Sequence, residues 1–166
     1  MRVLFILLLF FLASCTNRMD TAYMPGFLAE KRTQATRKGE IIKDLRPVVS
    51  VFATHLNEVD PVSYHQREFF FIEIFAQDSS VYENDVMTYK LYGLNNSSYT
   101  PIWIRPISKD EFDSIFYTTN KYAKAYLVAF PKLDRLSQEE AKLEMDLEGL
   151  GIITFNFAYS VPSLKF

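Results

Sequence analysis

Two histidines are the first residues of this 166-residue chain that could do chemistry, because imidazole binds metal ions and exchanges protons near neutral pH. His55 and His65 lie on either side of Glu58 and Asp60. A loop between two strands could gather these four side chains around a zinc ion, although they lack the spacing of helical pairs such as HExxH. The alternative that we favour puts His55 on a strand face and His65 in a solvated loop. We therefore predict no metal site and no cofactor.

Nucleophilic catalysis lacks its usual signals. The single cysteine, Cys15, lies in the leader region, so the rest of the chain has no thiol. The nucleophile elbow G-x-S-x-G does not occur in the sequence. The acidic cluster from Asp110 to Asp113 lies in the first turn of a predicted helix, where the helix dipole favours negative charge. We therefore predict no catalytic residues and a protein that is not an enzyme.

Aromatic side chains are the other candidates, because exposed rows of Tyr and Trp bind sugars, peptides and proteins in many sandwich domains. The chain has 15 Phe, 10 Tyr and one Trp. Most lie on the apolar face of a predicted strand, where we expect them to pack in the core. Exposure and surface contact with a ligand or partner are predicted for Trp103, Tyr92, Tyr99 and Tyr126.

The composition indicates one folded, strand-rich domain. Hydrophobic residues make up 49% and charged residues 23% of the chain, as in ordinary globular proteins. The aromatic fraction of 16% favours strands, since these side chains suit a half-buried pleated surface. The formal net charge of -2 offers no attraction to nucleic acid, so nucleic-acid partners are not expected.

Apolar residues alternate with polar ones in short segments, which predicts antiparallel strands. The clearest segment has Ile153, Phe155, Phe157, Tyr159 and Val161 on one face. A similar segment covers residues 141–147, and Gly149-Leu150-Gly151 joins the two as a hairpin. Further strands are expected at 40–45, 48–56, 68–76, 86–94, 101–105 and 122–130.

These segments predict an all-β, mainly antiparallel fold: an immunoglobulin-like β-sandwich of about seven strands. Pro101 and Pro106 place the 101–105 strand at a sheet edge. Ser108 and Glu111 have the spacing of a capping box and predict one short helix between strands. A small β-barrel is the alternative architecture.

The first 14 residues have the pattern of a signal peptide. Arg2 precedes eleven apolar residues, a run shorter than the roughly 20 that a membrane-spanning helix needs. The run ends in Leu12-Ala13-Ser14-Cys15, which resembles the lipobox of bacterial lipoproteins. The resemblance implies cleavage before Cys15, a diacylglycerol on its thiol and acylation of the new amino terminus.

Two or three acyl chains hold a protein stably on a membrane, because each buried CH₂ contributes about 0.8 kcal/mol. Thr16 follows the cysteine, whereas an Asp there favours the inner membrane in enteric bacteria, so the outer membrane is favoured. The resemblance thus implies an exported protein, anchored by its lipid, with its body in the periplasm or at the cell surface.

Residues 15–39 are polar and without regular pattern, which predicts a tether, and 40–166 are expected to form the single sandwich domain. The tether carries four basic residues, Lys31, Arg32, Arg37 and Lys38. They could contact anionic lipid headgroups, while a solvated linker is the alternative that we favour.

The function expected from these observations is that of a non-enzymatic envelope lipoprotein that docks onto another envelope protein, as an assembly factor or accessory subunit. One alternative is a module that binds a small ligand or sugar, which a preformed pocket lined by aromatic residues would favour. Another is an enzyme with its site scattered over loops, which a histidine and perturbed carboxylates in a cleft would favour.

The lipobox makes a direct prediction. Cells supplied with a labelled fatty acid should incorporate the label into the wild-type protein, and Cys15→Ser should abolish both the labelling and the retention in membranes. The reason is that the thiol is the acceptor of the diacylglycerol. Label that persists on the serine variant would contradict the assignment.

Overall fold

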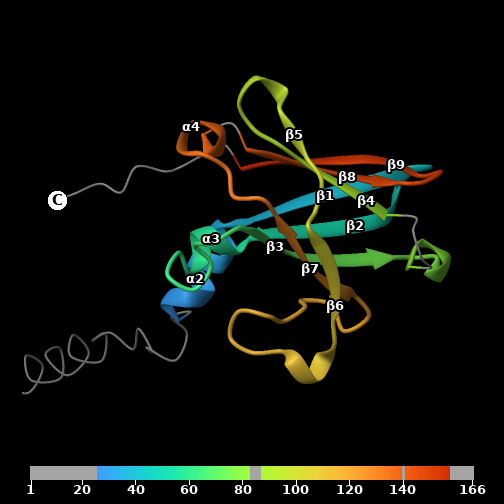
Figure 1. The fold of residues 1–166 in the computed structure, drawn as a ribbon. Coiled ribbons are helices and arrows are strands. Elements are labelled where there is room, and N and C mark those ends of the chain that lie inside the picture. The colour runs from blue at the N-terminus through green and yellow to red at the C-terminus, as the bar shows by residue number, and fades with distance from the viewer. Residues whose placement is uncertain (1–25, 83–86, 140, 158–166) are drawn as a thin grey trace, which may run out of the picture.

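The computed structural model describes residues 26–82, 87–139 and 141–157, which form nine strands in two antiparallel sheets (Figure 1). The first sheet has the order β1-β2-β3-β7-β6 and the second the order β5-β4-β8-β9. In the first sheet the strands are β1 (Thr36–Lys43), β2 (Arg46–His55), β3 (Glu68–Ala76), β7 (Lys124–Phe130) and β6 (Trp103–Ile107). In the second they are β5 (Ser98–Tyr99), β4 (Met87–Tyr92), β8 (Lys142–Leu147) and β9 (Gly151–Asn156).

The prediction of an all-β antiparallel sandwich is confirmed, with nine strands where about seven were expected. Each predicted segment overlaps one strand, and the two-residue β5 is additional. The Pro-containing segment is the edge strand β6, as expected from the missing amide hydrogen of proline. The hairpin between β8 and β9 is also present, with Gly149 and Gly151 at positive φ.

The main core lies between the two sheets. Phe70 and Ile72 of β3 point into it from one side, and Ile153 and Phe155 of β9 from the other. Phe157, just after β9, packs its ring 5.2 Å from that of Phe70, measured between centroids. The predicted inward face of the last segment is therefore confirmed up to residue 157. Tyr159 and Val161, predicted on the same face, lie outside the described residues.

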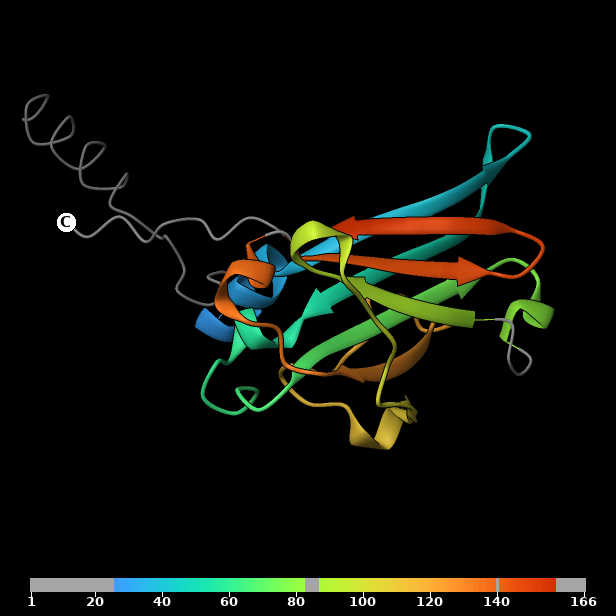
Figure 2. The same cartoon turned by 45° about the horizontal axis from the view of Figure 1, so that its top comes forward.

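The sheets converge along β1 and β9, which lie side by side (Figure 2). Gly39 permits this approach, because a Cβ atom there would lie 2.2 Å from Cγ2 of Ile153. Edge strand β1 is thus covered from the other sheet.

The structure differs from the expected tether from residue 27 onward. Helix α2 (Phe27–Gln34) and strand β1 occupy the part that was read as irregular. Arg32 of α2 is buried and pairs with Glu73 of β3, with 2.7 Å between Nη2 and Oε1. Since this contact is long-range, the local pattern could not show it. Cys15 and the rest of the tether lie outside the described residues.

The predicted short helix at Ser108 is a single 3-10 turn, η4 (Lys109–Glu111). Its capping box is present, but Phe112 already has an extended backbone. Phe112 leaves the turn to pack against a second apolar cluster on the outer face of the first sheet, around Phe71 and Leu127. Tertiary packing therefore shortens the helix.

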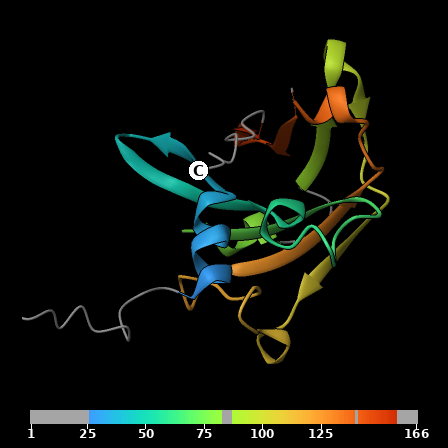
Figure 3. The same cartoon turned by 90° about the vertical axis from the view of Figure 1, so that its left-hand side faces the viewer.

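Three helical elements gather at one end of the sandwich, seen end-on in Figure 3. They are α2, the single turn α3 (Leu56–Val59) and the single turn α4 (Arg135–Gln138). The remaining turns are η2 (Ser79–Tyr82) and η3 (Leu94–Asn96). No helix within the described residues has the length and apolar character needed to cross a membrane.

Candidate functional site

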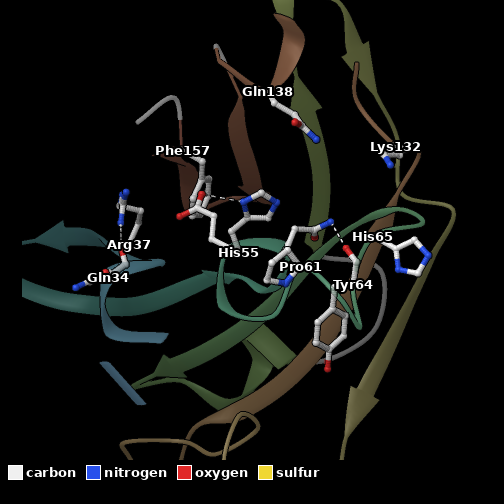
Figure 4. A pocket seen from close by; sticks show the side chains of 11 residues that line it. Gln34, Arg37, His55, Pro61, Tyr64, His65, Lys132, Gln138 and Phe157 are labelled. Carbon is white, nitrogen blue, oxygen red and sulfur yellow. Dashed lines mark hydrogen bonds and ion pairs between the residues drawn. The ribbon is translucent and has the colours of Figure 1, made fainter. Parts of the chain in front are cut away.

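A pocket of about 550 Å³ opens at the end of the sandwich where α2, α3 and α4 gather (Figure 4). Sites for small ligands typically measure about 300–1,000 Å³. The pocket is lined by Gln34, Arg37, His55, Asn57, Glu58, Pro61, Tyr64, His65, Lys132, Gln138 and Phe157. Its wall therefore combines two aromatic rings with cationic and amide side chains.

His55, the last residue of β2, lies at the centre of the pocket wall and is 8% exposed. Its Nδ1 is 2.9 Å from Oε1 of Glu58, and its Nε2 is 2.9 Å from Oε2 of Glu68. The imidazole also stacks on Phe70, with 4.8 Å between ring centroids. A doubly protonated ring donates to both carboxylates at once, so this geometry suits the imidazolium form.

Burial alone would lower the pKa of His55, but the hydrogen bonds and charges of Glu58 and Glu68 raise it above its ordinary value. The pKa of Glu68 shifts the opposite way. Burial would raise it, and hydrogen bonds from His55, Gln138 and the Leu133 amide lower it overall. The two residues therefore form a buried ion pair.

Glu68 is the functional residue that sequence reasoning missed. It opens β3 on the same face as Phe70, so the alternation of the strand points its carboxylate inward beside His55. Its Oε1 accepts hydrogen bonds from Nε2 of Gln138 at 2.9 Å and from the Leu133 amide at 3.2 Å. The signal was an acidic residue at the start of a strand that is apolar apart from Glu68 and Glu73.

The structure brings together only part of the predicted His/Asp/Glu group. His55 and Glu58 touch, whereas Oδ1 of Asp60 accepts hydrogen bonds from the amides of residues 62 and 63. His65 is exposed in the loop as expected, and its Nδ1 donates to the Val62 carbonyl at 2.7 Å. No three His, Cys, Asp or Glu side chains in the described ranges are arranged to hold a metal ion.

His55 does not have the arrangement of a general base. Both nitrogens of His55 already face carboxylates, so neither is free to take a proton from a bound molecule. Among its described lining residues there is no serine, threonine or cysteine that His55 could activate. His55 is therefore a charged side chain that is held in one orientation.

Two cationic side chains lie on opposite sides of the pocket (Figure 4). The guanidinium of Arg37 is held by backbone carbonyls, with Nη1 2.6 Å from the oxygen of Gln34 and Nε 3.1 Å from that of Asn156. Lys132 is exposed and makes no ion pair within the described part of the chain. Both charges are thus available to a ligand.

The aromatic residues predicted to make surface contacts are all half-buried, and none lines the pocket. Trp103 packs 6.0 Å from Phe69, measured between ring centroids. Tyr92 donates to Glu144 at 3.3 Å, while Tyr99 and Tyr126 pack against the main core. The four residues lie on four different strands, and each makes packing or hydrogen-bond contacts within the fold. Their contact with a partner stays a prediction.

An unexpected exposed feature is the tip of the hairpin between β1 and β2. Asp44 and Leu45 both have positive φ, at 49° and 61°, and Leu45 is 97% exposed. Ile42, beside a register shift in the ladder, is 62% exposed. A leucine in left-handed backbone costs about 1–2 kcal/mol, so this apolar tip carries backbone strain.

The ion pair predicts how stability depends on pH. The raised pKa of His55 contributes stability that is complete below its ordinary value of 6.5 and is lost as pH rises through the folded value. The lowered pKa of Glu68 contributes stability above its ordinary value of 4.5 that is lost as pH falls. The contribution of the pair should therefore be largest between these two values.

Urea unfolding of wild type and His55→Gln across pH 4 to 9 measures this contribution. The difference between the two free energies of unfolding should shrink above about pH 6.5, from a maximum of about 3–5 kcal/mol for breaking a buried pair. His65→Gln, at an exposed histidine, is the matched control and should follow the wild type. A difference that stays constant with pH would show that His55 is neutral.

The comparisons with known proteins identify no family. No family model matches the chain, and no curated protein matches it. Among solved structures it is similar to a crystal structure of a DUF4426 family protein from Pseudomonas aeruginosa PAO1. The sequence identity is 14% and the TM-score 0.36, over 66% of this chain and 86% of that one. A likeness of this degree carries no argument about function.

Proposed function

We propose that this protein is a lipid-anchored envelope protein whose folded domain binds a small ligand in the pocket beside His55, without catalysing a reaction. The observation that carries the proposal is the pocket itself, with about 550 Å³ of space and a wall that includes Tyr64 and Phe157. A preformed pocket with aromatic walls is what distinguishes a ligand-binding module from a purely docking one.

The anchor and the pocket fit together in this proposal. The lipobox ending at Cys15 supports export and lipid attachment, with the body in the periplasm or at the cell surface and the outer membrane favoured. The chain from Cys15 to Gly26 reaches at most about 40 Å when fully extended. Because Phe27 begins α2 at the pocket end, the anchor would hold the pocket near the membrane surface.

Ion pairing in the pocket supports a binding role over a catalytic one. The carboxylates of Glu58 and Glu68 fix the orientation of His55, and Phe70 stacks on its ring. A rigid polar wall loses little conformational entropy when a ligand binds, so it contributes to affinity.

Blocking the pocket tests the proposal. Gln34 is exposed at the end of α2 and lines the pocket, so Gln34→Trp should fill the opening without disturbing the core. Native mass spectrometry of protein purified from its own membranes should show a bound small molecule on wild type and its loss from the variant. Thr33→Trp, at an exposed neighbour that does not line the pocket, is the control. Equal ligand occupancy in Gln34→Trp and wild type would contradict the proposal.

Docking onto an envelope protein is the second candidate function, and the hairpin tip is the observation that favours it. Leu45 exposes nearly all of its side chain in a strained backbone conformation. Its sequence neighbours Asp44 and Arg46 carry opposite charges, so the tip is a small exposed apolar surface between charged residues. Such a surface suits an apolar recess on a partner protein whose rim carries complementary charges.

Leu45→Asn tests the docking function, because it should raise the stability of the fold and lower the capture of partners. Asparagine tolerates positive φ better than leucine, so the free energy of unfolding should rise by up to about 1–2 kcal/mol, measured by urea denaturation. Capture of envelope partners from detergent extracts, identified by mass spectrometry, should fall. Val62→Asn, at another exposed apolar residue, is the control and should capture as wild type does. Undiminished capture by Leu45→Asn would reject the tip as a contact.

A further inference from the structure

Charges of alternating sign line the pocket. Arg37 lies on one side and Lys132 on the opposite side, with His55 between them (Figure 4). Glu58 stands beside His55, since its Oε1 is 2.9 Å from Nδ1 of the ring. The order across the pocket is therefore a cation, a carboxylate and a second cation.

Arg37 is oriented but not neutralised. Its Nη1 and Nε are used by the carbonyl oxygens of Gln34, Thr36 and Asn156, all within 3.1 Å. A carbonyl oxygen orients a guanidinium without cancelling its charge, and no carboxylate pairs with Arg37 in the described ranges. A guanidinium held in this way is prepared to bind a carboxylate of a ligand.

Glu58 carries the excess negative charge of the group formed by His55, Glu58 and Glu68. The imidazolium of His55 balances one carboxylate, and Glu68 is the one that is buried with it at 1% exposure. Two carboxylates around one imidazolium leave a net charge of about -1, which resides on the partly exposed Glu58. A protonated amine would be attracted to this point, and a third carboxylate would be repelled.

We infer that the pocket takes an amino dicarboxylate, a molecule with a carboxylate toward each end and a protonated amine between them. One carboxylate pairs with Arg37 and the other with Lys132, while the amine donates to Glu58. The intervening carbon chain lies against Phe157, which also lines the pocket. This inference rests on the proposed ligand-binding function and adds the chemical class of the ligand.

Titration calorimetry of the intact mature protein, solubilised in detergent with its lipid anchor, tests the inference with defined probes. The probes are 3-aminopentanedioate, 4-aminoheptanedioate and 5-aminononanedioate, each beside its amine-free parent and the corresponding amino monocarboxylate. One length should bind best. At that length, removing the amine or one carboxylate should weaken binding about tenfold or more, as expected for a lost charged hydrogen bond.

Three variants assign the contacts. Arg37→Gln and Lys132→Met should each remove the advantage of the dicarboxylate over the amino monocarboxylate. Glu58→Gln, which keeps an oxygen for His55, should remove the advantage of the amine and leave the parent dicarboxylate bound as well or better. Lys90→Met and Glu148→Gln, at exposed residues away from the pocket, are the matched controls and should bind as wild type.

The outcomes separate this inference from the proposed function. Suppose that no probe binds but a co-purified molecule is lost from Gln34→Trp. The pocket then binds a ligand of another class, so the amino dicarboxylate inference is overturned and the proposed ligand-binding function stands. If no probe binds and Gln34→Trp also changes nothing, both are overturned. A preference for the amine that persists in Glu58→Gln would likewise overturn the inference.

Discussion

Two buried carboxylates on one strand hold the segments that surround the pocket. Glu68 and Glu73 of β3 are 1% and 2% exposed, and a buried charge is tolerated only when it is paired and hydrogen-bonded. Their odd spacing places them on opposite faces of the sheet. On the inner face, Glu68 holds His55 and the segment after β7 through the Leu133 amide. On the outer face, Glu73 holds α2 through Arg32 and the loop before β7 through the Thr119 amide.

The pocket depends on both pairings, although only one of them lines it. Glu68 fixes the imidazole in the wall, and Glu73 fixes Arg32, whose guanidinium also lies 3.7 Å from the centre of the Tyr117 ring. Arg32 is the buried residue of α2, so its pairing with Glu73 helps to hold Gln34, at the end of the helix, beside the pocket. The binding surface is therefore a consequence of charge burial in a strand whose other residues are mostly apolar.

The strands could be predicted from the sequence, and His55, Glu58 and His65 of the pocket wall were among its candidate residues. The long-range pairings that hold the site could not be predicted. In β3 the alternation of Phe70, Ile72 and Ile74 identifies both the element and its inward face, because a period of two is a local property. Arg32 and Glu73 are 41 residues apart, and the helix that carries Arg32 has no apolar face to reveal it. A usable signal did exist, since two acids within an apolar strand require cationic or amide partners elsewhere in the fold. It indicates that partners exist without identifying them.

The β1–β2 hairpin connects the two candidate surfaces, because its open end borders the pocket and its tip carries Leu45 at the other end of the sandwich (Figure 1). At about 3.4 Å per residue, eight residues of β1 separate the two by more than 20 Å. Over such a distance, effects of substitutions on stability add, and coupling between the sites would need a strand that moves as a unit. Because β1 is paired with β2 on one side and covered by β9 on the other, the hairpin is held from its open end as far as Ile41. A ligand in the pocket would therefore influence docking at the tip through the position of the whole domain on its anchor, not through a change in the tip itself.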